Sequence, residues 1–415
     1  MSSHHPVGVR RCFALFVVGL LTAGCSGCRE GSTVADAGRE VGGDVIPYVD
    51  AGVDLRPDMD TRCGGKRILT PTPVTRGVGQ PCGTGCRQIS FGPYASQRYE
   101  VQDDILVYSE ESLFLEQRVY MVDLARDEEW IIRVPYFRER PGCYWVSTDG
   151  KRLAYSCVIS PAPGQYTEPL QIYDPLTHEE QDLECIPLMV GKSSAIADLT
   201  LGSTGIAARL SVTSIAPYAW FHNFSDGSFS EVSASATWFT HMSGPRLVWA
   251  EAMAQSQIVL YDTVTKVKTV LDPQPHGQWL PRIDGDRIVW VDHRNSTGDM
   301  WDQGASDIYL HDLSTGKTES VIIHSARQDY PDVWGDWVVW EDWRNNPNPT
   351  PRYASEFINS DIFAKNLKTG QVAQLTSGKG MELRPQVDND RVFFTMLDGN
   401  QSASLFMIDL KQRLP

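Results

Sequence analysis

Two short motifs have residue types and a spacing that could bind a ligand. Four consecutive residues of each motif follow the same pattern: Asp292, His293, Arg294 and Asn295, then Asp342, Trp343, Arg344 and Asn345. Arginine can bind a carboxylate or glycan hydroxyls through two parallel hydrogen bonds, and Trp343 and Trp301 could stack on a sugar ring. Alternatively, Asp and Arg two residues apart at a strand end form a local ion pair that orders the loop. The recurrence of the motif within a longer repeat favours this second interpretation.

The longer repeat is 21 residues long and aligns in four places without a gap. The copies are Gln88–Tyr108, Val270–Trp290, Ser320–Trp340 and Gln374–Phe394. All four copies have Asp at the seventeenth position and an aromatic residue at the twenty-first, and three have Pro at the twelfth. Weaker copies end at Tyr155 and Trp249, and a degraded copy spans Leu201–Ala208. An internal repeat at a period of 40 to 55 residues is typical of solenoids and propellers.

Each repeat predicts four short strands. A tight turn such as Asp284-Gly-Asp286 separates the first strand from an apolar second strand, and a third strand reads Asp-Ile-Tyr-Leu at Asp307. Four-stranded units at this period predict an all-β fold, a single β-propeller of antiparallel blades. We expect seven blades, with six as the alternative if residues 185–233 are an irregular insertion. Because the last unit ends after its third strand, we expect residues near 87–90 to complete it and close the ring.

The repeat resembles those of TolB-like propellers. The resemblance is carried by Trp145–Tyr155, which contains the Ser-Thr-Asp-Gly-Lys turn, and by Ile288–Asn295 joined to Asp307–Gly316. It covers roughly residues 87–411 and implies a propeller fold without specifying an activity, since one fold hosts many functions. TolB itself has an α/β domain before a six-bladed propeller, whereas here only about 25 residues separate the expected tether from the first blade, so a role in the TolB translocation system is not implied.

The N-terminus predicts export. Arg10 and Arg11 precede an apolar run, 13–24, that is too short to span a bilayer. Leu21-Thr-Ala-Gly-Cys25 resembles a bacterial lipobox, which implies cleavage before Cys25, lipidation of its side chain and, because Ser26 follows, an outer-membrane position. An ordinary signal peptide is the alternative. The two arginines also resemble a twin-arginine signal, with a plain positive region as the alternative.

These observations divide the chain into four parts. We expect a lipoprotein-type signal peptide at 1–24, a disordered tether rich in Gly and Asp at 25–62, a Cys-containing segment at 63–86 and the propeller at 87–415. The formal charge of −15 becomes −17 once Arg10 and Arg11 leave with the signal. A chain this acidic is not expected to bind nucleic acid.

The cysteine content fits an exported protein, because nine cysteines would be unusual in a reducing compartment. Cys143 and Cys157 flank the turn at Asp149 almost symmetrically and are expected to form a disulfide across neighbouring strands. Cys63, Cys82 and Cys86 are expected to supply a second bridge. No second ligand pair with metal-site spacing accompanies Cys82 and Cys86, so zinc is not expected.

The sequence predicts a binding protein rather than a catalyst. No Gly-x-Ser-x-Gly elbow and no hydrolase domain is present, so we expect no catalytic residue, no metal, no cofactor and no enzyme. We expect a membrane-tethered, monomeric scaffold of the cell envelope, periplasmic or surface-exposed, that contacts the membrane only through its lipid. It would bind a protein or glycan through the face with the long loops after Val291 and Glu341. The alternative is a glycosidase or lyase acting on polysaccharide in the central channel.

Overall fold

The computed structural model describes residues 65–75, 82–90, 94–111, 117–133, 143–162, 165–187, 196–210, 218–233, 235, 237–296, 305–351, 357–378, 380–397 and 403–414. Almost all regular structure in these residues is β, and one short helix, α1 (Leu410–Arg413), follows the last strand. No helix among these residues has the length and apolar character that crossing a bilayer requires.

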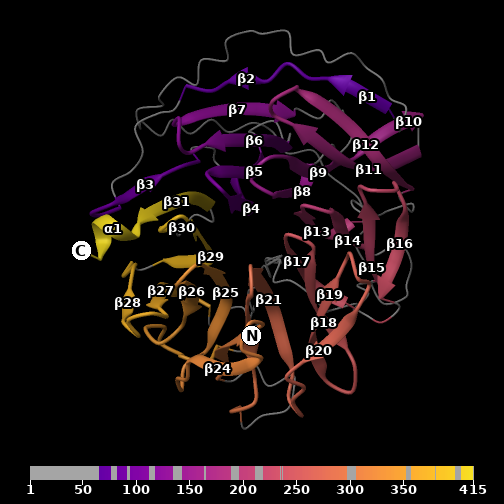
Figure 1. Cartoon of the computed structure of the whole chain (residues 1–415). Coiled ribbons are helices and arrows are strands. Elements are labelled where there is room, and N and C mark those ends of the chain that lie inside the picture. The colour runs from indigo at the N-terminus through magenta and orange to yellow at the C-terminus, as the bar shows by residue number, and fades with distance from the viewer. Residues whose placement is uncertain are drawn as a thin grey trace, which may run out of the picture. The chain divides into compact units, whose positions relative to one another are not determined.

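The strands form seven sheets around a common centre (Figure 1). From the innermost strand outward, blade 1 contains β4 (Tyr94–Gln102), β5 (Ile105–Glu111), β6 (Gln117–Asp123) and β7 (Glu128–Arg133). Blade 2 contains β8 (Cys143–Thr148), β9 (Leu153–Cys157), β11 (Gln165–Asp174) and β12 (Glu179–Pro187), with β10 (Ile159–Ala162) beside β11. Blade 3 contains β13 (Ile196–Gly202), β14 (Gly205–Leu210), β15 (Tyr218–Asn223) and β16 (Phe229–Ser233).

The remaining four blades follow the same antiparallel order. Blade 4 contains β17 (Thr237–Ser243), β18 (Arg246–Ala252), β19 (Ser256–Asp262) and β20 (Lys268–Leu271). Blade 5 contains β21 (Gln278–Asp284), β22 (Arg287–Asp292), β23 (Asp307–Asp312) and β24 (Lys317–Ile322). Blade 6 contains β25 (Gln328–Trp334), β26 (Trp337–Asp342), β27 (Asp361–Asn366) and β28 (Val372–Gln374). Blade 7 contains β29 (Met381–Asp388), β30 (Arg391–Leu397), β31 (Ala403–Asp409) and β3 (Cys86–Gln88).

The blade count and the ring closure confirm the sequence-based prediction. The degraded copy forms the first two strands of blade 3, which makes seven blades and excludes six. Strand β3 pairs with β31 through Cys86–Ile408 and Gln88–Phe406, so a segment from the start of the propeller completes its last blade. The backbone N–H groups of Ile89 and Ser90 extend the closure by donating to the carbonyl of Leu405. Closure by hydrogen bonds removes the free edges of blades 1 and 7.

The segment before β3 adds strands that the sequence did not predict. Strand β1 (Gly65–Ile68) pairs with β12 at the outer edge of blade 2, and β2 (Thr72–Pro73) pairs with β7 at the outer edge of blade 1. Arg67 in β1 forms ion pairs with Glu180 and Asp182, whose side chains are fully buried. Strands β1, β2 and β3 therefore lie at the outer edges of blades 2, 1 and 7, and β1 supplies a charge to the interior of blade 2.

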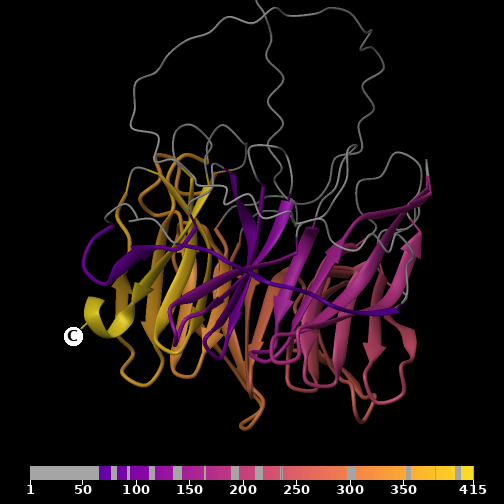
Figure 2. The ribbon, with the colours of Figure 1, turned by 90° about the horizontal axis from the view of Figure 1, so that it is seen from above.

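The repeated Asp at the seventeenth position joins neighbouring blades. In each case a side chain of one blade donates to the Asp of the next: Arg246 to Asp286 at 2.6 Å, Arg287 to Asp336 at 3.0 Å, Trp337 to Asp390 at 2.9 Å and Arg391 to Asp104 at 2.5 Å. The backbone carbonyl of the same Asp also accepts an N–H from the residue that follows the third strand, such as Leu313 or Leu367. The tight turns thus form one linked rim, which lies opposite the long connections (Figure 2).

The hydrophobic core lies between the blades and is built from the repeated aromatic residues. Trp249, Trp290 and Trp340 are fully buried, and each packs among strands of its own blade and of a neighbour. Two disulfides support this framework. Cys143–Cys157 joins β8 and β9 as expected, and Cys82–Cys86 lies directly before the closing strand β3. Cys28 and Cys63 lie outside the described residues.

Candidate functional site

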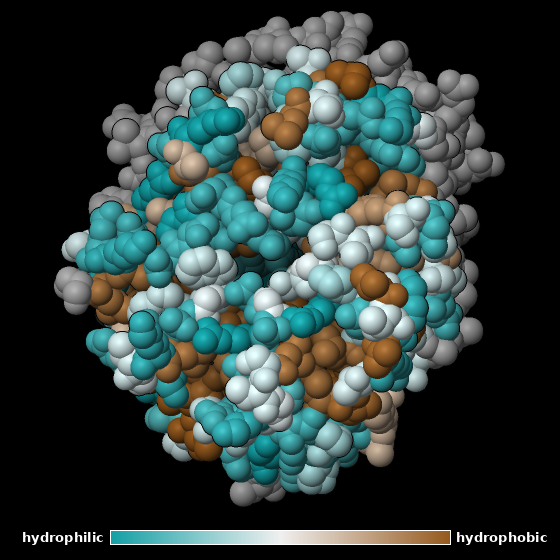
Figure 3. All heavy atoms as spheres, in the orientation of Figure 1, coloured by the Kyte–Doolittle hydropathy of each residue, from teal (hydrophilic) through white to brown (hydrophobic). Residues whose placement is uncertain are grey.

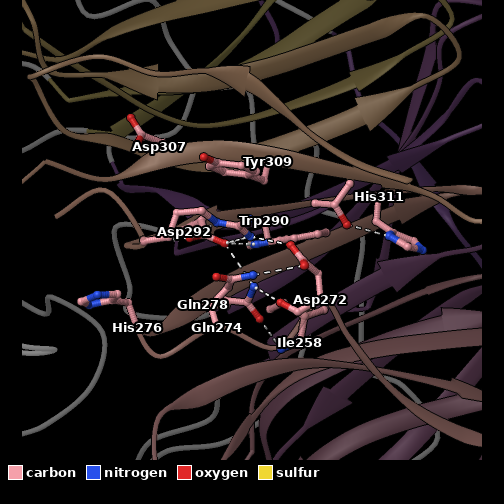
Figure 4. Close-up of polar contacts among 12 residues, drawn as sticks. Ile258, Asp272, Gln274, His276, Gln278, Trp290, Asp292, Asp307, Tyr309 and His311 are labelled. Atoms are coloured by element: carbon pink, nitrogen blue, oxygen red, sulfur yellow. Dashed lines mark hydrogen bonds and ion pairs between the residues drawn. The ribbon is translucent and has the colours of Figure 1, made fainter. Parts of the chain in front are cut away.

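The first of the two loop motifs forms a closed ion-pair network at the end of β22. Asp292 is fully buried, and its two oxygens accept from Arg294 at 2.7–2.9 Å, from the indole N–H of Trp290 at 2.8 Å and from the amide of Gln278 at 3.1 Å. Figure 4 shows Trp290, Gln278 and Asp272 gathered around this carboxylate, with His276 apart from it. Burial opposes ionisation of Asp292, but the hydrogen bonds from Arg294 and Trp290 outweigh it and lower its pKa.

The second motif repeats this network in blade 6. Arg344 donates to both oxygens of Asp342 at 2.7–2.8 Å, and Trp340 donates to the same carboxylate at 2.9 Å. The guanidinium of Arg344 lies 4.3 Å from the centre of the Phe363 ring, as that of Arg294 lies 3.9 Å from Tyr309. The two asparagines also have matching roles, because Asn295 donates to Asp307 and Asn345 donates to Asp361. The geometry is that of the local ion pair which orders the loop.

The aromatic and His members of the motifs are also packed inside the protein. Trp343 is 2% exposed and lies edge-on to Phe357, with ring centres 4.9 Å apart. Burial lowers the pKa of His293, with a further contribution from the charge of Arg327 and an opposing one from Asp329. Trp301 and Cys25 lie outside the described residues. Among the described members of the two motifs, only Asn295 and Asn345 are exposed, while the two arginines and His293 are half-buried.

A second group of polar residues lies at the centre of the ring, where the sequence analysis did not place a site. The thirteenth position of the repeat falls on the innermost strand of every blade and is polar in all seven. In blade order these residues are Glu100, Ser147, Thr200, His241, Arg282, Asp332 and Gln386. A β-bulge precedes this position in each innermost strand. Bulges re-aim side chains and are frequent beside active sites.

Five residues of this ring hold neighbouring blades together. Each accepts a hydrogen bond from a backbone N–H of the next blade, at 2.8–3.2 Å. The pairs are Ser147 with Leu201, Thr200 with Met242, His241 with Ile283, Asp332 with Val387, and Gln386 with Val101. These five side chains therefore have a structural role, because each joins its blade to the next one.

The other two residues of the ring bind each other across the channel. Arg282 of blade 5 donates to Glu100 of blade 1 at 3.0 Å, and His241 of blade 4 lies 2.9 Å from the same carboxylate oxygen. Because the Nδ1 atom of His241 accepts from the N–H of Ile283, a neutral His241 carries its proton on Nε2 and donates it to Glu100. The side chain of Glu100 is 13% exposed. Charged groups from opposite blades therefore meet on the axis of the ring.

The protonation states of the two central carboxyl groups differ. Burial favours the neutral form of Glu100, but Arg282 and His241 outweigh it and lower its pKa. Burial raises the pKa of Asp332 to about 6, against the opposing charges of Arg282 and His241. Near neutral pH, Glu100 is a carboxylate, and Asp332 is mostly ionised but retains its proton in a minor fraction of molecules. Two nearby carboxyl groups whose pKa values are driven apart are typical of acid–base sites.

A small cavity opens beside this cluster. Its volume is about 50 Å³, and its lining includes Glu100, His241, Asp332, Asp284 and Asp388. Figure 3 shows the hollow at the centre of the ring, bordered mainly by hydrophilic residues. A cavity of this size holds a few water molecules, so any larger ligand must approach the cluster from a mouth of the channel.

A second row of side chains lies two residues earlier on the innermost strands, towards the long connections. In blades 6, 7, 1 and 2 this row consists of Tyr330, Arg384, Arg98 and Trp145. The Arg384 guanidinium carbon lies 5.4 Å from the Tyr330 ring centre, and that of Arg98 lies 3.7 Å from Trp145. All four residues are partly exposed.

The described residues do not offer a metal site. No cluster of three or more His, Cys, Asp or Glu among them is arranged to hold an ion. The ring at the thirteenth position was missed because each member looks like an isolated polar residue in its own strand. The signal was nevertheless present in the gap-free alignment, where Glu100, Arg282, Asp332 and Gln386 occupy one column.

Comparisons with known proteins show the fold of this chain. No protein-family model matches it, and no curated protein matches it. Solved structures similar to it include an oligogalacturonate lyase in complex with manganese, with a TM-score of 0.54 at 12% identity over 84% of this chain and 98% of that one. An acylaminoacyl peptidase from Pyrococcus horikoshii has a TM-score of 0.51 at 12% identity, over 76% of this chain and 51% of that one.

TolB from Acinetobacter baumannii also matches, with a TM-score of 0.37 at 13% identity over 73% of this chain and 79% of that one, which is too distant to support an inference. At the level of fold, this chain is a seven-bladed β-propeller, as the repeat predicted. The expectation that the chain is not an enzyme is contradicted, because enzymes stand among its most similar solved structures. That expectation rested on the absence of a local catalytic motif, whereas a channel site assembles single residues from separate blades. At 12% identity the likeness shows the fold alone.

Proposed function

We propose that this protein binds a glycan at the loop-side mouth of its central channel and acts on it by acid–base chemistry. The observation that carries the proposal is the cluster of Glu100, His241, Arg282 and Asp332, which four different blades bring together at one point. Ser147, Thr200 and Gln386 join neighbouring blades without any charge, so contact between blades does not require ionisable residues at this position. Convergent polar groups with perturbed pKa values in a concave site are the usual mark of a reaction centre.

The residues of the cluster have complementary roles in this proposal. Glu100 is ionised and acts as the base, while Arg282 stabilises negative charge that develops beside it. Asp332, with its pKa of about 6, donates a proton to the leaving oxygen. His241 holds Glu100 in place through its Nε2–H group. Cleavage of a glycosidic bond by hydrolysis or by elimination requires one group of each kind.

The choice of a glycan is supported by two features. Two aromatic residues flank two arginines in the row Tyr330, Arg384, Arg98 and Trp145, and such a mixture of aromatic and hydrogen-bonding groups suits a hydroxyl-rich ring. An oligogalacturonate lyase shares the fold over 98% of its length. The manganese of that protein has no counterpart among the described residues, and the roles proposed here use no metal.

The experiment that tests the proposal is a cleavage assay with the full-length protein. A panel of soluble polysaccharides is incubated with the wild type, and new reducing ends and unsaturated products are both measured. We expect Asp332→Asn and Glu100→Gln each to lower turnover by about 10²-fold or more while glycan binding persists. Ser147→Ala, at the same level of the channel, is the matched control and should retain activity. If the wild type binds a glycan without cleaving it, the catalytic part of the proposal is refuted and the protein is a binding module. If the wild type neither binds nor cleaves a glycan, the whole proposal is refuted.

We further propose that the propeller works at the outer membrane, tethered through lipid on Cys25, where it meets an envelope glycan. The lipobox-like Leu21–Cys25 and the Gly- and Asp-rich stretch 26–62 support this location. Cys25→Ser should move the protein from the detergent phase to the aqueous phase in a detergent partition assay. An unchanged partition would show that the lipid anchor is absent.

A further inference from the structure

One of the two disulfides lies at the point where the ring of blades is closed. Cys82 and Cys86 bridge the loop 82–86, which leads directly into β3, and Cys86 is the first residue of that strand. The three residues of β3 pair with β31, from Cys86 opposite Ile408 to Gln88 opposite Phe406. The disulfide therefore fixes the end of the short strand on which the closure depends.

The disulfide loop also holds the C-terminal helix α1 at blade 7 (Figure 1). The carbonyl of Gly85 accepts the N–H of Asp409 at 2.9 Å, and the side chain of Asp409 caps α1 by accepting from the N–H groups of Lys411 and Gln412. Gly85 has a φ of +70°, and a Cβ atom at this position would lie 3.0 Å from the Cβ of Gln412. A side chain there would force the loop away from the helix. The disulfide loop, β3 and α1 thus form one unit, which we call the closure clasp.

The two disulfides differ in how closely a reductant can approach them. Cys143 and Cys157 are 0% and 1% exposed on β8 and β9, whereas Cys82 and Cys86 are partly exposed in their loop. Thiol–disulfide exchange requires a thiolate to reach one of the two sulfur atoms directly. The buried bridge is therefore reached only after blade 2 has opened, whereas the bridge of the closure clasp is accessible in the folded protein.

We propose that Cys82–Cys86 is a redox-sensitive bridge, and that its reduction by a dithiol loosens the closure of the ring. A thiolate of the dithiol attacks one sulfur to form a mixed disulfide, and the second thiol of the same molecule then displaces the protein. The reductant becomes a disulfide, and the two cysteines take up two electrons and two protons as free thiols. Without the bridge, β3 alone holds the loop and α1 in place, so the closure clasp opens more often. This inference goes beyond the proposed function, because it concerns the closure of the ring and not the channel.

The junction between blades 7 and 1 has a second set of contacts on its inner side. The N–H of Val101 donates to Gln386 at 3.0 Å, and the hydroxyl of Tyr99 donates to the carbonyl of Phe393 at 3.0 Å. None of these four residues belongs to the closure clasp. Reduction should therefore loosen the outer part of blade 7, while the channel and the other blades keep their structure.

The first test is whether the two disulfides of the folded, full-length protein differ in reactivity. Existing thiols are blocked with N-ethylmaleimide, and dithiothreitol is then added under native conditions. The thiols that appear are labelled with deuterated N-ethylmaleimide and assigned by mass spectrometry of peptides. We expect Cys82 and Cys86 to be labelled about tenfold or more faster than Cys143 and Cys157. Equal rates for the two pairs, or no reduction of Cys82–Cys86, would overturn the proposal.

The second test measures the opening of the closure clasp by hydrogen exchange of the oxidised and the reduced protein. In the reduced protein, the backbone amides of 86–90 and 405–413 should exchange about tenfold or more faster than in the oxidised protein. The amides of 246–252 in blade 4 should exchange at the same rate in both. Unchanged exchange at 86–90 and 405–413 after reduction would show that the disulfide does not govern the closure.

Two variants separate the disulfide from other changes at the same place. The double variant Cys82→Ser, Cys86→Ser should reproduce the faster exchange without dithiothreitol. Arg87→Gln is the matched control, because it removes the exposed ion pair between β3 and Asp127 and retains the disulfide. Its exchange should equal that of the wild type, and acceleration as large as that in the double variant would contradict the role given to the disulfide.

Discussion

Two pairs of arginines differ in what surrounds their guanidinium groups. The outer pair, Arg294 and Arg344, closes on buried carboxylates at the ends of β22 and β26. The inner pair, Arg98 and Arg384, lies on the innermost strands, where each guanidinium group faces an aromatic ring, Trp145 and Tyr330 respectively. The outer pair was visible in the sequence as a motif, whereas the inner pair was not. The outer motif recurs in two neighbouring blades and forms the same ion pair in both, whereas the inner positions carry different residues from blade to blade.

The first way to test this comparison is to remove an outer arginine. Arg344→Met leaves Asp342 fully buried without its cation, and uncompensated buried charges destabilise proteins by about 3–5 kcal/mol. Urea denaturation should show a loss of that size. The double variant Asp342→Asn, Arg344→Met should recover part of the loss, because the orphaned charge is then absent. A loss below about 1 kcal/mol would show that the network does not support the fold.

Removing Arg67, the cation that β1 supplies to blade 2, should destabilise the fold somewhat less than removing Arg344. Arg67 pairs with Glu180 and Asp182, but Arg133 also lies 3.7 Å from Glu180 and remains in place after substitution. We therefore expect Arg67→Met to cost about 2–3 kcal/mol, again by urea denaturation. Lys66→Met, one residue away in an exposed ion pair with Glu179, should change stability by less than about 1 kcal/mol. Equal effects of the two substitutions would contradict the assignment.

The buried carboxyl group of Glu382 should make the stability of the fold depend on pH. Glu382 occupies the repeat position of Gln278 and Gln328 and is 2% exposed beside Asp361. Burial and the charge of Asp361 raise its pKa to about 8, against opposing hydrogen bonds from Thr376 and from its own main chain. Its folded pKa lies above the unfolded value near 4.5, so this group stabilises the fold below that value and the contribution is lost as pH rises to about 8.

Glu382→Gln should remove that dependence on pH. At pH 9 the variant should be more stable than the wild type by more than about 1 kcal/mol, since each pKa unit corresponds to about 1.4 kcal/mol. At pH 5 the two should be nearly equal. Thermal unfolding across this range measures the difference. Parallel pH profiles of the two proteins would mean that Glu382 is ionised in the fold at neutral pH.

The sequence was informative where interactions are local or repeated. The turn at Asp286, the anchor Trp290 and the closing strand at Gln88 all follow from a pattern within one copy of the repeat. It was uninformative where partners are far apart in the chain, as for Glu100 and Arg282, which are separated by 182 residues. Strand β1 was missed for the same reason, because its partner β12 lies more than 100 residues away and its own four residues carry no alternation.

The smallest effect on stability is expected for Arg384→Gln, and it tests directly whether the inner and outer arginines differ. Arg384→Gln should change the free energy of unfolding by less than about 1 kcal/mol, because the bonds from Tyr99 and to Glu341 involve the main chain of residue 384, which the substitution retains. Removing the charge of Arg384 also relieves repulsion on Arg98. The measurement is urea denaturation of Arg384→Gln and Arg344→Met under the same conditions, with the two losses of stability compared. If both variants lose about 3 kcal/mol or more, the inner arginines are structural like the outer ones.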